Sequence, residues 1–250
     1  MSKTDLTTEL VRLERGDGVA TITLNRPEAL NALVREMWLG LDAILTDLAS
    51  DESTTVVILT GAGRAFSAGL DINAIREGAQ ANHEEMLRVV NGLERLPQAT
   101  IGAINGYCFT GALELVMACD ILLAAESAKV GDTHAKFGMA PSLGGPQRLS
   151  ARIGAGAAKE LLFSSRHYTA AECAALGLVN RVYPDETFMD AVRGLAGEMA
   201  QNSRYSIATQ KRMVATTAQH GLGVGLQVVD SFQPPSGPDM AERLASFKKS

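Results

Sequence analysis

Glu114 is the residue of this sequence best placed to move a proton in apolar surroundings. It is the only charged residue between Arg95 and Asp120, and burying a carboxylate is costly unless the protein compensates for it. Gly111 precedes it by three residues, so the two share one face of a helix. The first helical turn has free N–H groups, and glycine lets a ligand approach them. A free amide beside a buried carboxylate could bind an oxyanion while the carboxylate transfers a proton next to it. The alternative is a purely structural glutamate, which the dipole of the helix would stabilise in the first turn.

A second candidate region is the glycine-rich stretch GAGRAFSAGLD at 61–71. Its opening lacks the third glycine at the spacing of a dinucleotide fingerprint. The part at 65–69 resembles a nucleophile elbow, but several residues separate it from the preceding strand, which argues against Ser67 as a nucleophile. A backbone amide near Leu70 that faces a ligand is the better interpretation. Together with the amide of Gly111 it would form an oxyanion hole.

The composition is that of an ordinary globular protein. A chain of 250 residues with 46% hydrophobic and 20% charged residues suits one large domain, or a domain with a small appendage. A net charge of −5 with scattered Lys and Arg argues against a nucleic-acid groove. No apolar run reaches the roughly 18 residues that span a bilayer, and the N-terminus lacks a signal peptide's apolar core. We expect a cytoplasmic protein with no nucleic-acid or membrane partner.

The cysteines and histidines give no sign of a metal site. Cys108, Cys119 and Cys173 are odd in number and widely spaced. This spacing argues against a disulfide framework, and nothing near them resembles a metal cluster. We therefore expect no metal.

Strand patterns alternate with helix patterns, which predicts an α/β fold of stacked, mostly parallel strands. Two short strands are expected within 9–25, around a turn at 16–18. Continuous apolar runs predict buried strands at 55–60, 99–105 and 121–125.

The helices are predicted from the spacing of apolar residues. They are expected after Pro27, with the apolar positions running from Leu30 to Leu48, and over 73–96 and 111–120. From residue 154 onward the sequence is mainly helical, with a break at 178–182. A proline-rich linker at 233–238 precedes a last short helix.

Five motifs resemble those of the crotonase (enoyl-CoA hydratase/isomerase) superfamily. They are NRP with NAL at 25–33, AFSAGLD at 65–71, NGY with Gly111 and Glu114 at 105–114, PSLGGPQRL at 141–149 and ALGLVN at 175–180. They occur in the family's order and spacing along essentially the whole chain. The resemblance implies a spiral of stacked ββα units over 1–190 that carries an acyl-CoA site. It also implies a C-terminal helical region over 191–250 for trimerisation and pocket closure.

The resemblance implies an acyl-CoA thioester as substrate, with coenzyme A as part of that substrate and no separate cofactor. Its thioester oxygen would lie between the backbone amides of Leu70 and Gly111, which would stabilise an enolate-like charge. The CoA end would lie against Arg26 and Ala29, and the adenine against the loop at 68–72. The remaining residues expected to contact substrate are Ala68, Asp71, Ile72, Tyr107, Thr133 and Met139.

His134 marks a departure from the family pattern. In hydratases two glutamates hold a water over the alkene; Glu114 matches the first, and His134 stands where the second is expected. Because imidazole can donate and accept protons near neutral pH, His134 is our second catalytic candidate. It could equally leave Glu114 as the sole base, which would suit double-bond isomerisation. Asp132 is expected to cap the segment that follows it.

The function implied is hydration of a 2-enoyl-CoA to a 3-hydroxyacyl-CoA by a homotrimer or a hexamer. The alternatives are a Δ3-Δ2 enoyl-CoA isomerase, a hydrolase of a CoA thioester or a β-diketone, and a non-catalytic acyl-CoA binder. The retained Glu114 and Gly111 argue against the pure binder, which has no need of a buried carboxylate. Side-chain identity alone does not fix the length of the acyl chain.

Overall fold

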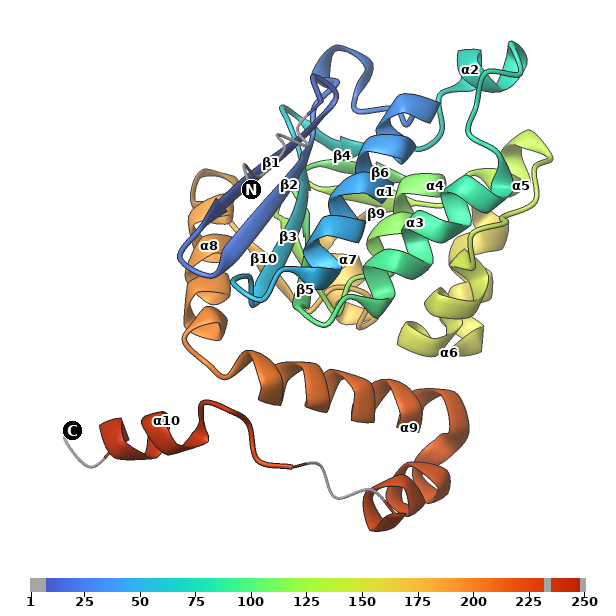
Figure 1. Ribbon diagram of the computed structural model, residues 1–250. Coiled ribbons are helices and arrows are strands. Elements are labelled where there is room, and N and C mark those ends of the chain that lie inside the picture. The colour runs from blue at the N-terminus through green and yellow to red at the C-terminus, as the bar shows by residue number, and fades with distance from the viewer. Residues whose placement is uncertain (1–7, 232–234, 248–250) are drawn as a thin grey trace.

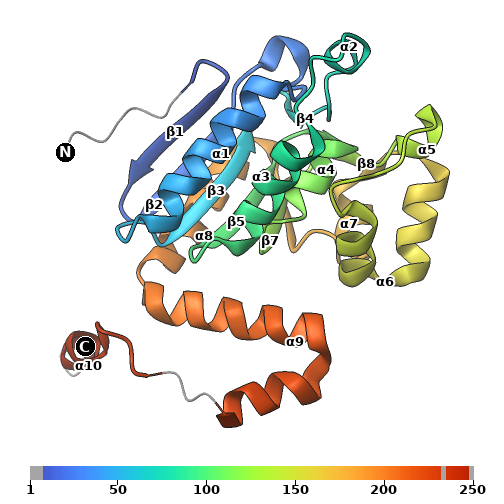
Figure 2. The ribbon, with the colours of Figure 1, turned by 45° about the vertical axis from the view of Figure 1, so that its right-hand side comes forward.

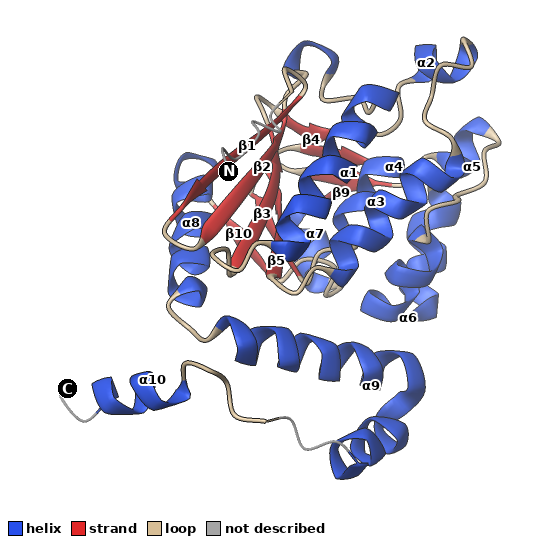
Figure 3. Cartoon of the chain, viewed as in Figure 1, coloured by secondary structure: helices blue, strands red, loops and turns tan. Residues whose placement is uncertain are grey.

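Two mostly parallel β-sheets form the core of the computed structural model, which describes residues 8–231 and 235–247 (Figures 1 and 3). The larger sheet has the order β1-β2-β3-β5-β7-β10 and the smaller β4-β6-β8-β9. The larger sheet comprises β1 (Val11–Gly16), β2 (Val19–Leu24), β3 (Val56–Gly61), β5 (Ala99–Ile104), β7 (Ile121–Ala125) and β10 (Arg181–Tyr183). The smaller comprises β4 (Ala65–Ser67), β6 (Tyr107–Phe109), β8 (Lys129–Gly131) and β9 (Tyr168–Thr169). Among these strands, β1–β2 and β8–β9 pair antiparallel and the other pairs are parallel.

Three successive pairs of strands repeat one arrangement. β3, β5 and β7 lie side by side in the larger sheet, and the strand that follows each of them joins the smaller sheet. The helices are α1 (Arg35–Ser50), α2 (Ile72–Arg76), α3 (His83–Arg95), α4 (Gly111–Val116), α5 (His134–Phe137), α6 (Gly145–Ser164), α7 (Ala170–Ala175), α8 (Phe188–Ala200), α9 (Arg204–Ser231) and α10 (Met240–Phe247), with 3-10 turns η1 (Pro27–Ala29) and η2 (Asp185–Thr187). Helices follow β4, β6 and β8, so the core is a spiral of stacked ββα units, as the family resemblance implies.

The larger sheet is covered on both faces, which is why its central strands are continuously apolar. In β3, Val57 and Leu59 belong to the apolar cluster that includes residues of α1 and α3. Val56 and Ile58 belong to a second cluster, together with Phe188 of α8. Successive side chains of a strand point to opposite faces, so a strand buried on both sides has no polar alternation.

α9 crosses the amino ends of three strands of the larger sheet. Arg204 Nε donates to the carbonyl of Thr54, just before β3, at 3.1 Å. Lys211 Nζ donates to the carbonyl of Gln98, just before β5, at 3.0 Å, and pairs with Asp120, just before β7, at 2.8 Å. Figures 1 and 2 show the chain then turning away, so that α10 lies apart from the two sheets.

Several predicted boundaries are wrong. The helix expected from Leu30 begins at Arg35, because Leu30 and Asn31 adopt left-handed φ angles of 52° and 54° after η1. The helix expected over 73–96 is two helices, α2 and α3, and Asn82 caps the start of α3. The helix expected over 111–120 ends at Val116, whereas α6 begins at Gly145 rather than at 154.

The predicted strands within 9–25 and at 55–60, 99–105 and 121–125 are confirmed, with β1, β2, β3, β5 and β7 close to the expected bounds. β4, β6 and β8 are missing from the sequence-based prediction, because strands of three residues are too short to show an alternation. Of the expected linker, 233 and 234 lie outside the described residues, and 235–237 are not helical. All three cysteines are buried and free. Within the described ranges, no helix is both long and apolar enough to cross a membrane.

Candidate active site

Glu114 lies in the first turn of α4 and is almost completely buried, at 2% exposure. Its Oε1 atom accepts hydrogen bonds from the backbone N–H groups of Leu143 and Gly145, both at 2.9 Å. Burial raises the pKa of the Glu114 carboxyl, while the two amides oppose that rise. With Oε1 held in this way, Oε2 is the oxygen that faces His134.

The segment that holds Glu114 requires glycine at position 145. A Cβ added to Gly145 would lie 2.7 Å from Cγ of Glu114 and 2.9 Å from its Oε1. Arg148 fixes the same segment, since its Nη1 donates to the carbonyl of Leu143 at 2.7 Å. The motif at 141–149 signals this segment in the sequence. The sequence does not predict that the amides of Leu143 and Gly145 donate to Glu114, because nothing in it indicates which amides point at that carboxylate.

His134 is 6% exposed and lies on α5, in the ββα unit that follows the one with Glu114. Its imidazole faces Glu114. Its Nε2 lies 3.8 Å from Oε2 of Glu114, and its Nδ1 lies 2.8 Å from Oδ2 of Asp132. The other oxygen of Asp132 accepts the backbone N–H of His134 at 3.0 Å, so Asp132 holds the first residue of α5 from one position before the N-cap, which is Thr133. The structure therefore brings Asp132, His134 and Glu114 into one row.

The electrostatics of this row favour retention of a proton. Burial alone would lower the pKa of His134, but the hydrogen bond and charge of Asp132 and the charge of Glu114 outweigh it, so the pKa is raised. The pKa of Glu114 is also raised. An ionised carboxylate whose pKa is raised is the stronger base, and an imidazole whose pKa is raised holds a proton that it can deliver.

The backbone amides of Leu70 and Gly111 lie close to each other. A Cβ at Gly111 would lie 3.7 Å from the nitrogen of Leu70, and one at Gly69 would lie 3.4 Å from the nitrogen of Gly111. The backbone N–H of Leu33 donates to the carbonyl of Gly69 at 2.8 Å, and the carbonyl of Leu33 accepts the N–H of Asp71 at 3.1 Å. The N–H of Leu70 takes no part in these two hydrogen bonds. Gly111 opens α4, where N–H groups have no partner within the helix. These two amides are therefore candidate donors for an oxyanion hole.

Thr110, immediately before Gly111, has an unusual backbone conformation that the sequence does not reveal. Its φ is 54° and its ψ is −113°; a non-glycine residue held outside the common regions costs about 1–3 kcal/mol. Thr133, an expected substrate contact, shares a hydrogen bond of 2.7 Å with the Thr110 hydroxyl. The N–H of Thr110 donates to the carbonyl of Gly131 at 2.9 Å. These contacts fix the direction in which the chain enters α4.

Arg26 and Asp71, both expected near CoA, are joined to each other. Nη1 of Arg26 donates to Oδ2 of Asp71 at 2.6 Å and to the carbonyl of Ala32 at 3.1 Å. Oδ1 of Asp71 accepts the N–H groups of Asn73 and Ala74 and so caps α2. The hydrogen bond from Arg26 and these amides keep the pKa of Asp71 below its ordinary value.

The other expected substrate contacts lie on several elements. Ala29 ends η1 and Ala68 follows β4, and both are half-buried, as is Tyr107 on β6. Ile72, at the start of α2, is 47% exposed, and Met139, just after α5, is 37% exposed. Figures 1 and 2 place α2 and α5 at the same end of the molecule.

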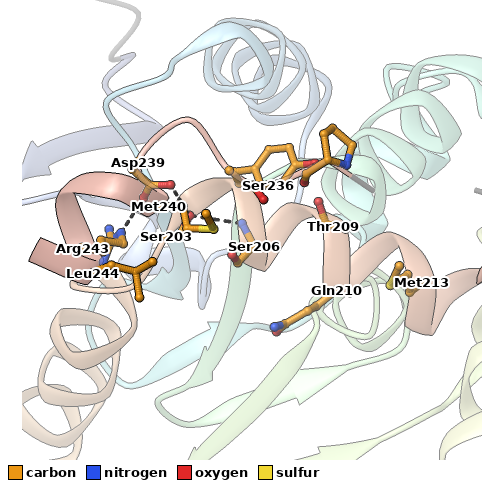
Figure 4. Close-up of a pocket in the computed structure, with 13 residues that line it drawn as sticks. Ser203, Ser206, Thr209, Gln210, Met213, Ser236, Asp239, Met240, Arg243 and Leu244 are labelled. Atoms are coloured by element: carbon orange, nitrogen blue, oxygen red, sulfur yellow. Dashed lines mark hydrogen bonds and ion pairs between the residues drawn. The ribbon is translucent and has the colours of Figure 1, made fainter. Parts of the chain in front are cut away.

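A pocket of about 440 Å³ lies elsewhere, on the C-terminal helices (Figure 4). It is lined by residues of 203–213 and 235–244, and none of the expected catalytic or binding residues is among them. Ser203 Oγ donates to Asp239 at 2.8 Å across it. No group of His, Cys, Asp and Glu suited to a metal ion occurs in the described part of the chain.

The sequence and the fold are similar to those of known proteins. Residues 14–230 match the model of the family described as enoyl-CoA hydratase/isomerase. A probable peroxisomal enoyl-CoA hydratase of Arabidopsis thaliana is 40% identical over 86% of this chain and 82% of its own length. The short-chain-enoyl-CoA hydratase of Clostridium acetobutylicum is 34% identical over 82% of this chain and 80% of its own length. The crystal structure of an enoyl-CoA hydratase from Bacillus anthracis is 32% identical, with a TM-score of 0.87 over 96% of each chain.

The family match covers the ββα spiral, the amides of Leu70 and Gly111, and the carboxylate of Glu114. By the family model, the identity to these relatives and the shared fold, the chain belongs to the enoyl-CoA hydratase/isomerase family.

Proposed function

We propose that this protein hydrates a 2-enoyl-CoA to a 3-hydroxyacyl-CoA. The observation that carries the proposal is the facing pair of Glu114 Oε2 and His134 Nε2, 3.8 Å apart. Two such groups can hold one water between them and exchange its protons. The relatives named enoyl-CoA hydratase support the same reaction class.

The reaction follows from these groups in order. The amides of Leu70 and Gly111 hold the thioester oxygen, where negative charge develops. Glu114 accepts a proton from the water as its oxygen bonds to C3, and the alkene electrons move toward the thioester oxygen. Protonated His134 then delivers a proton to C2, and transfer of the proton from Glu114 to His134 restores the site. One water is consumed, no electrons are exchanged, and no cofactor beyond the CoA of the substrate is required.

For CoA recognition we propose the surface made by η1 and the loop after β4. Arg26 immediately precedes η1 and Ala29 ends it, while Ala68 lies on the loop and Ile72 opens α2 directly after it. Because both carboxylate oxygens of Asp71 are used within the protein, Asp71 would act by fixing Arg26 and the loop. Tyr107, Thr133 and Met139 remain proposed contacts of the acyl end.

The decisive test is incubation with crotonyl-CoA, longer 2-enoyl-CoAs and 3-enoyl-CoAs, with products identified by mass. Hydration adds the mass of one water to the 2-enoyl substrates. Isomerisation changes retention but not mass, and thioester hydrolysis releases free CoA. Consumption of 3-enoyl-CoA without any hydrated product would contradict the proposed hydration. It would favour the isomerase alternative, in which Glu114 is the sole base. Binding without turnover would favour the non-catalytic alternative.

We also propose that residues 1–190 form the acyl-CoA core and that 191–250 mediate assembly into a homotrimer or a hexamer. The support is a set of exposed apolar side chains on α9 and α10: Val214 at 69%, Leu222 at 67%, Leu226 at 56% and Leu244 at 57%. Apolar surface of this kind is typical of interfaces. Light scattering at micromolar concentration should give three or six times the 26.4 kDa chain mass. A monomer would contradict this proposal.

For localisation we propose the cytoplasm, on the support of three buried, free thiols. Imaging of a tagged chain tests this, because the names of two relatives mention the peroxisome and the mitochondrion.

A further inference from the structure

We propose that Asp132 is a positioning residue that acts through His134, by fixing which ring nitrogen carries the proton and which faces Glu114. The catalytic part of this inference rests on the proposed hydration. Its structural part concerns the tautomer of one imidazole and can be measured without any reaction.

Asp132 directs both of its carboxylate oxygens at one residue. Oδ1 accepts the backbone N–H of His134 at 3.0 Å and lies 3.1 Å from its Nδ1. Oδ2 lies 2.8 Å from the same Nδ1. A capping contact needs only Oδ1, so the contact of Oδ2 with the ring is additional to what the turn requires. Asp132 is 3% exposed, and a carboxylate so deeply buried needs a partner.

The chemistry of the contact selects the tautomer. An ionised carboxylate can only accept, so Nδ1 of His134 must carry the hydrogen. In the neutral ring Nε2 then has its lone pair free, and this is the atom 3.8 Å from Oε2 of Glu114. The protonated ring presents an N–H at the same place. Nε2 can therefore take up and release a proton toward the space beside Glu114, whereas the opposite tautomer would present a fixed N–H there.

The surrounding charges support this assignment. The charged groups that act on the imidazole are Asp132, on the turn before α5, and Glu114, on α4. The amides of Leu143, just before α6, and of Gly145, its first residue, hold Oε1 of Glu114, and they leave Oε2 directed at the ring. Asp132 thus lies behind the imidazole and Glu114 in front of it, as in sites where a buried aspartate orients a catalytic histidine.

The substitution Asp132→Asn separates capping from positioning. The amide oxygen can still accept the backbone N–H of His134, while the NH₂ group replaces Oδ2 opposite Nδ1. A donor at this place favours a ring with an unprotonated Nδ1 and an N–H at Nε2. We expect kcat for crotonyl-CoA hydration to fall by about 10²–10⁴-fold with KM within about threefold, since proton transfer is lost and binding is kept.

Nitrogen-15 NMR of the histidine ring in the full-length protein gives the independent measurement. The wild type should show the Nδ1–H tautomer above its pKa, and Asp132→Asn should show the Nε2–H tautomer with a lower ring pKa. Asp185→Asn is the matched control, because Asp185 also accepts a backbone N–H, from Ser127 at 3.0 Å, on an exposed turn. It should change neither the spectrum nor the kinetics.

A double-mutant cycle tests whether Asp132 acts through His134. In the His134→Gln background, Asp132→Asn should reduce kcat no further. If Asp132→Asn does not fold, Asp132→Ser replaces it in these measurements, because serine keeps one oxygen that can accept the backbone N–H of His134. This variant should lower both the pKa of the His134 ring and kcat. An unchanged tautomer and pKa in the folded variant would overturn the proposal. A wild type that shows the Nδ1–H tautomer but no hydration would overturn the proposed function and leave the role of Asp132 in orienting the ring standing.

Discussion

Glu114 and His134 face each other because the strands that precede their helices, β6 and β8, pair in parallel. β6 and β8 are neighbours, with Phe109 opposite Gly131, and α4 and α5 begin shortly after the two strands end. The carboxyl ends of adjacent parallel strands lie at one edge of a sheet, so the residues that follow them meet. Oε2 of Glu114 and Nε2 of His134 consequently lie 3.8 Å apart although the two residues are twenty positions apart in sequence.

Substitution of Glu114 by glutamine should abolish most turnover. Glutamine keeps the shape and can still accept the amides of Leu143 and Gly145 with its oxygen, but an NH₂ group replaces the basic Oε2. We expect activity on the true substrate to fall by about 10²–10⁴-fold, which is the usual share of general acid–base catalysis. Affinity for a saturated acyl-CoA should change little, and the exposed Glu198→Gln is the control. Near-normal turnover would contradict a base at this position.

Gly145→Ala should damage catalysis without a direct contact to substrate. The new Cβ would lie 2.7 Å from Cγ of Glu114, so the carboxylate must move. We expect kcat to fall by at least about tenfold, because sub-ångström placement matters in proton transfer. Gly156→Ala on the same helix is the matched control, since nothing lies within 4 Å of the added carbon. It should keep activity and stabilise by about 0.5–1 kcal/mol. Equal kinetics for the two variants would contradict the tight packing at 145.

Gly111→Val should remove the oxyanion site while the fold survives. A Cβ at this position already lies 3.1 Å from Cγ of Leu70, and two further methyl groups would occupy the space in front of the amides. Loss of one oxyanion donor costs about 10²–10³-fold in kcat. Steady-state kinetics, with circular dichroism to confirm folding, checks this. A folded and fully active variant would rule out the amide of Gly111 as an oxyanion donor.

Much of this site follows from the sequence, and the remainder depends on how loops close on it. Glu114 and Gly111 are marked by an isolated charge in an apolar helix, and His134 by its place in a family motif. The amides of Leu143 and Gly145 are not marked, because a hydrogen bond to a carboxylate depends on loop direction, which glycine leaves open. Leu30 and Asn31 likewise have left-handed φ angles, so α1 begins only after them. The backbone of this segment is hydrogen-bonded to the loop at 68–70, a contact that the sequence does not indicate. Tertiary contacts override local preference at both places.

The stability contributed by His134 should depend on pH. Burial works against the charged ring, but Asp132 and Glu114 outweigh it and raise the pKa of His134 above its unfolded value. A group with a raised folded pKa binds more protons when folded, so its contribution is present at low pH and is lost as pH rises through the folded pKa. The difference in unfolding free energy between wild type and His134→Gln should therefore shrink as pH rises from below the ordinary histidine pKa of 6.5 through the raised pKa of the folded protein. Urea titrations measure it, and a difference that grows with pH would contradict the assignment.

Replacement of His134 by glutamine separates hydration from isomerisation. For a hydratase, kcat/KM should show an ionisation near neutral pH that disappears in His134→Gln, together with most of the hydration. For an isomerase that uses Glu114 alone, the same variant should isomerise within a few-fold of wild type, and neither protein should hydrate crotonyl-CoA.

The family glutamate can be restored at position 134 only if Asp132 changes with it. In His134→Glu alone, a third carboxylate would join Glu114 and Asp132 in a buried cluster, and mutual repulsion would hold a proton on one of them. Asp132→Asn removes one charge and keeps the capping oxygen. We therefore expect the double variant Asp132→Asn/His134→Glu to hydrate crotonyl-CoA at least about tenfold faster than His134→Glu, since a like charge shifts a pKa by a unit or more. Steady-state rates at matched pH provide the measurement. If the single variant equals the double, Asp132 exerts no electrostatic control over position 134, and the row of three residues is not one catalytic unit.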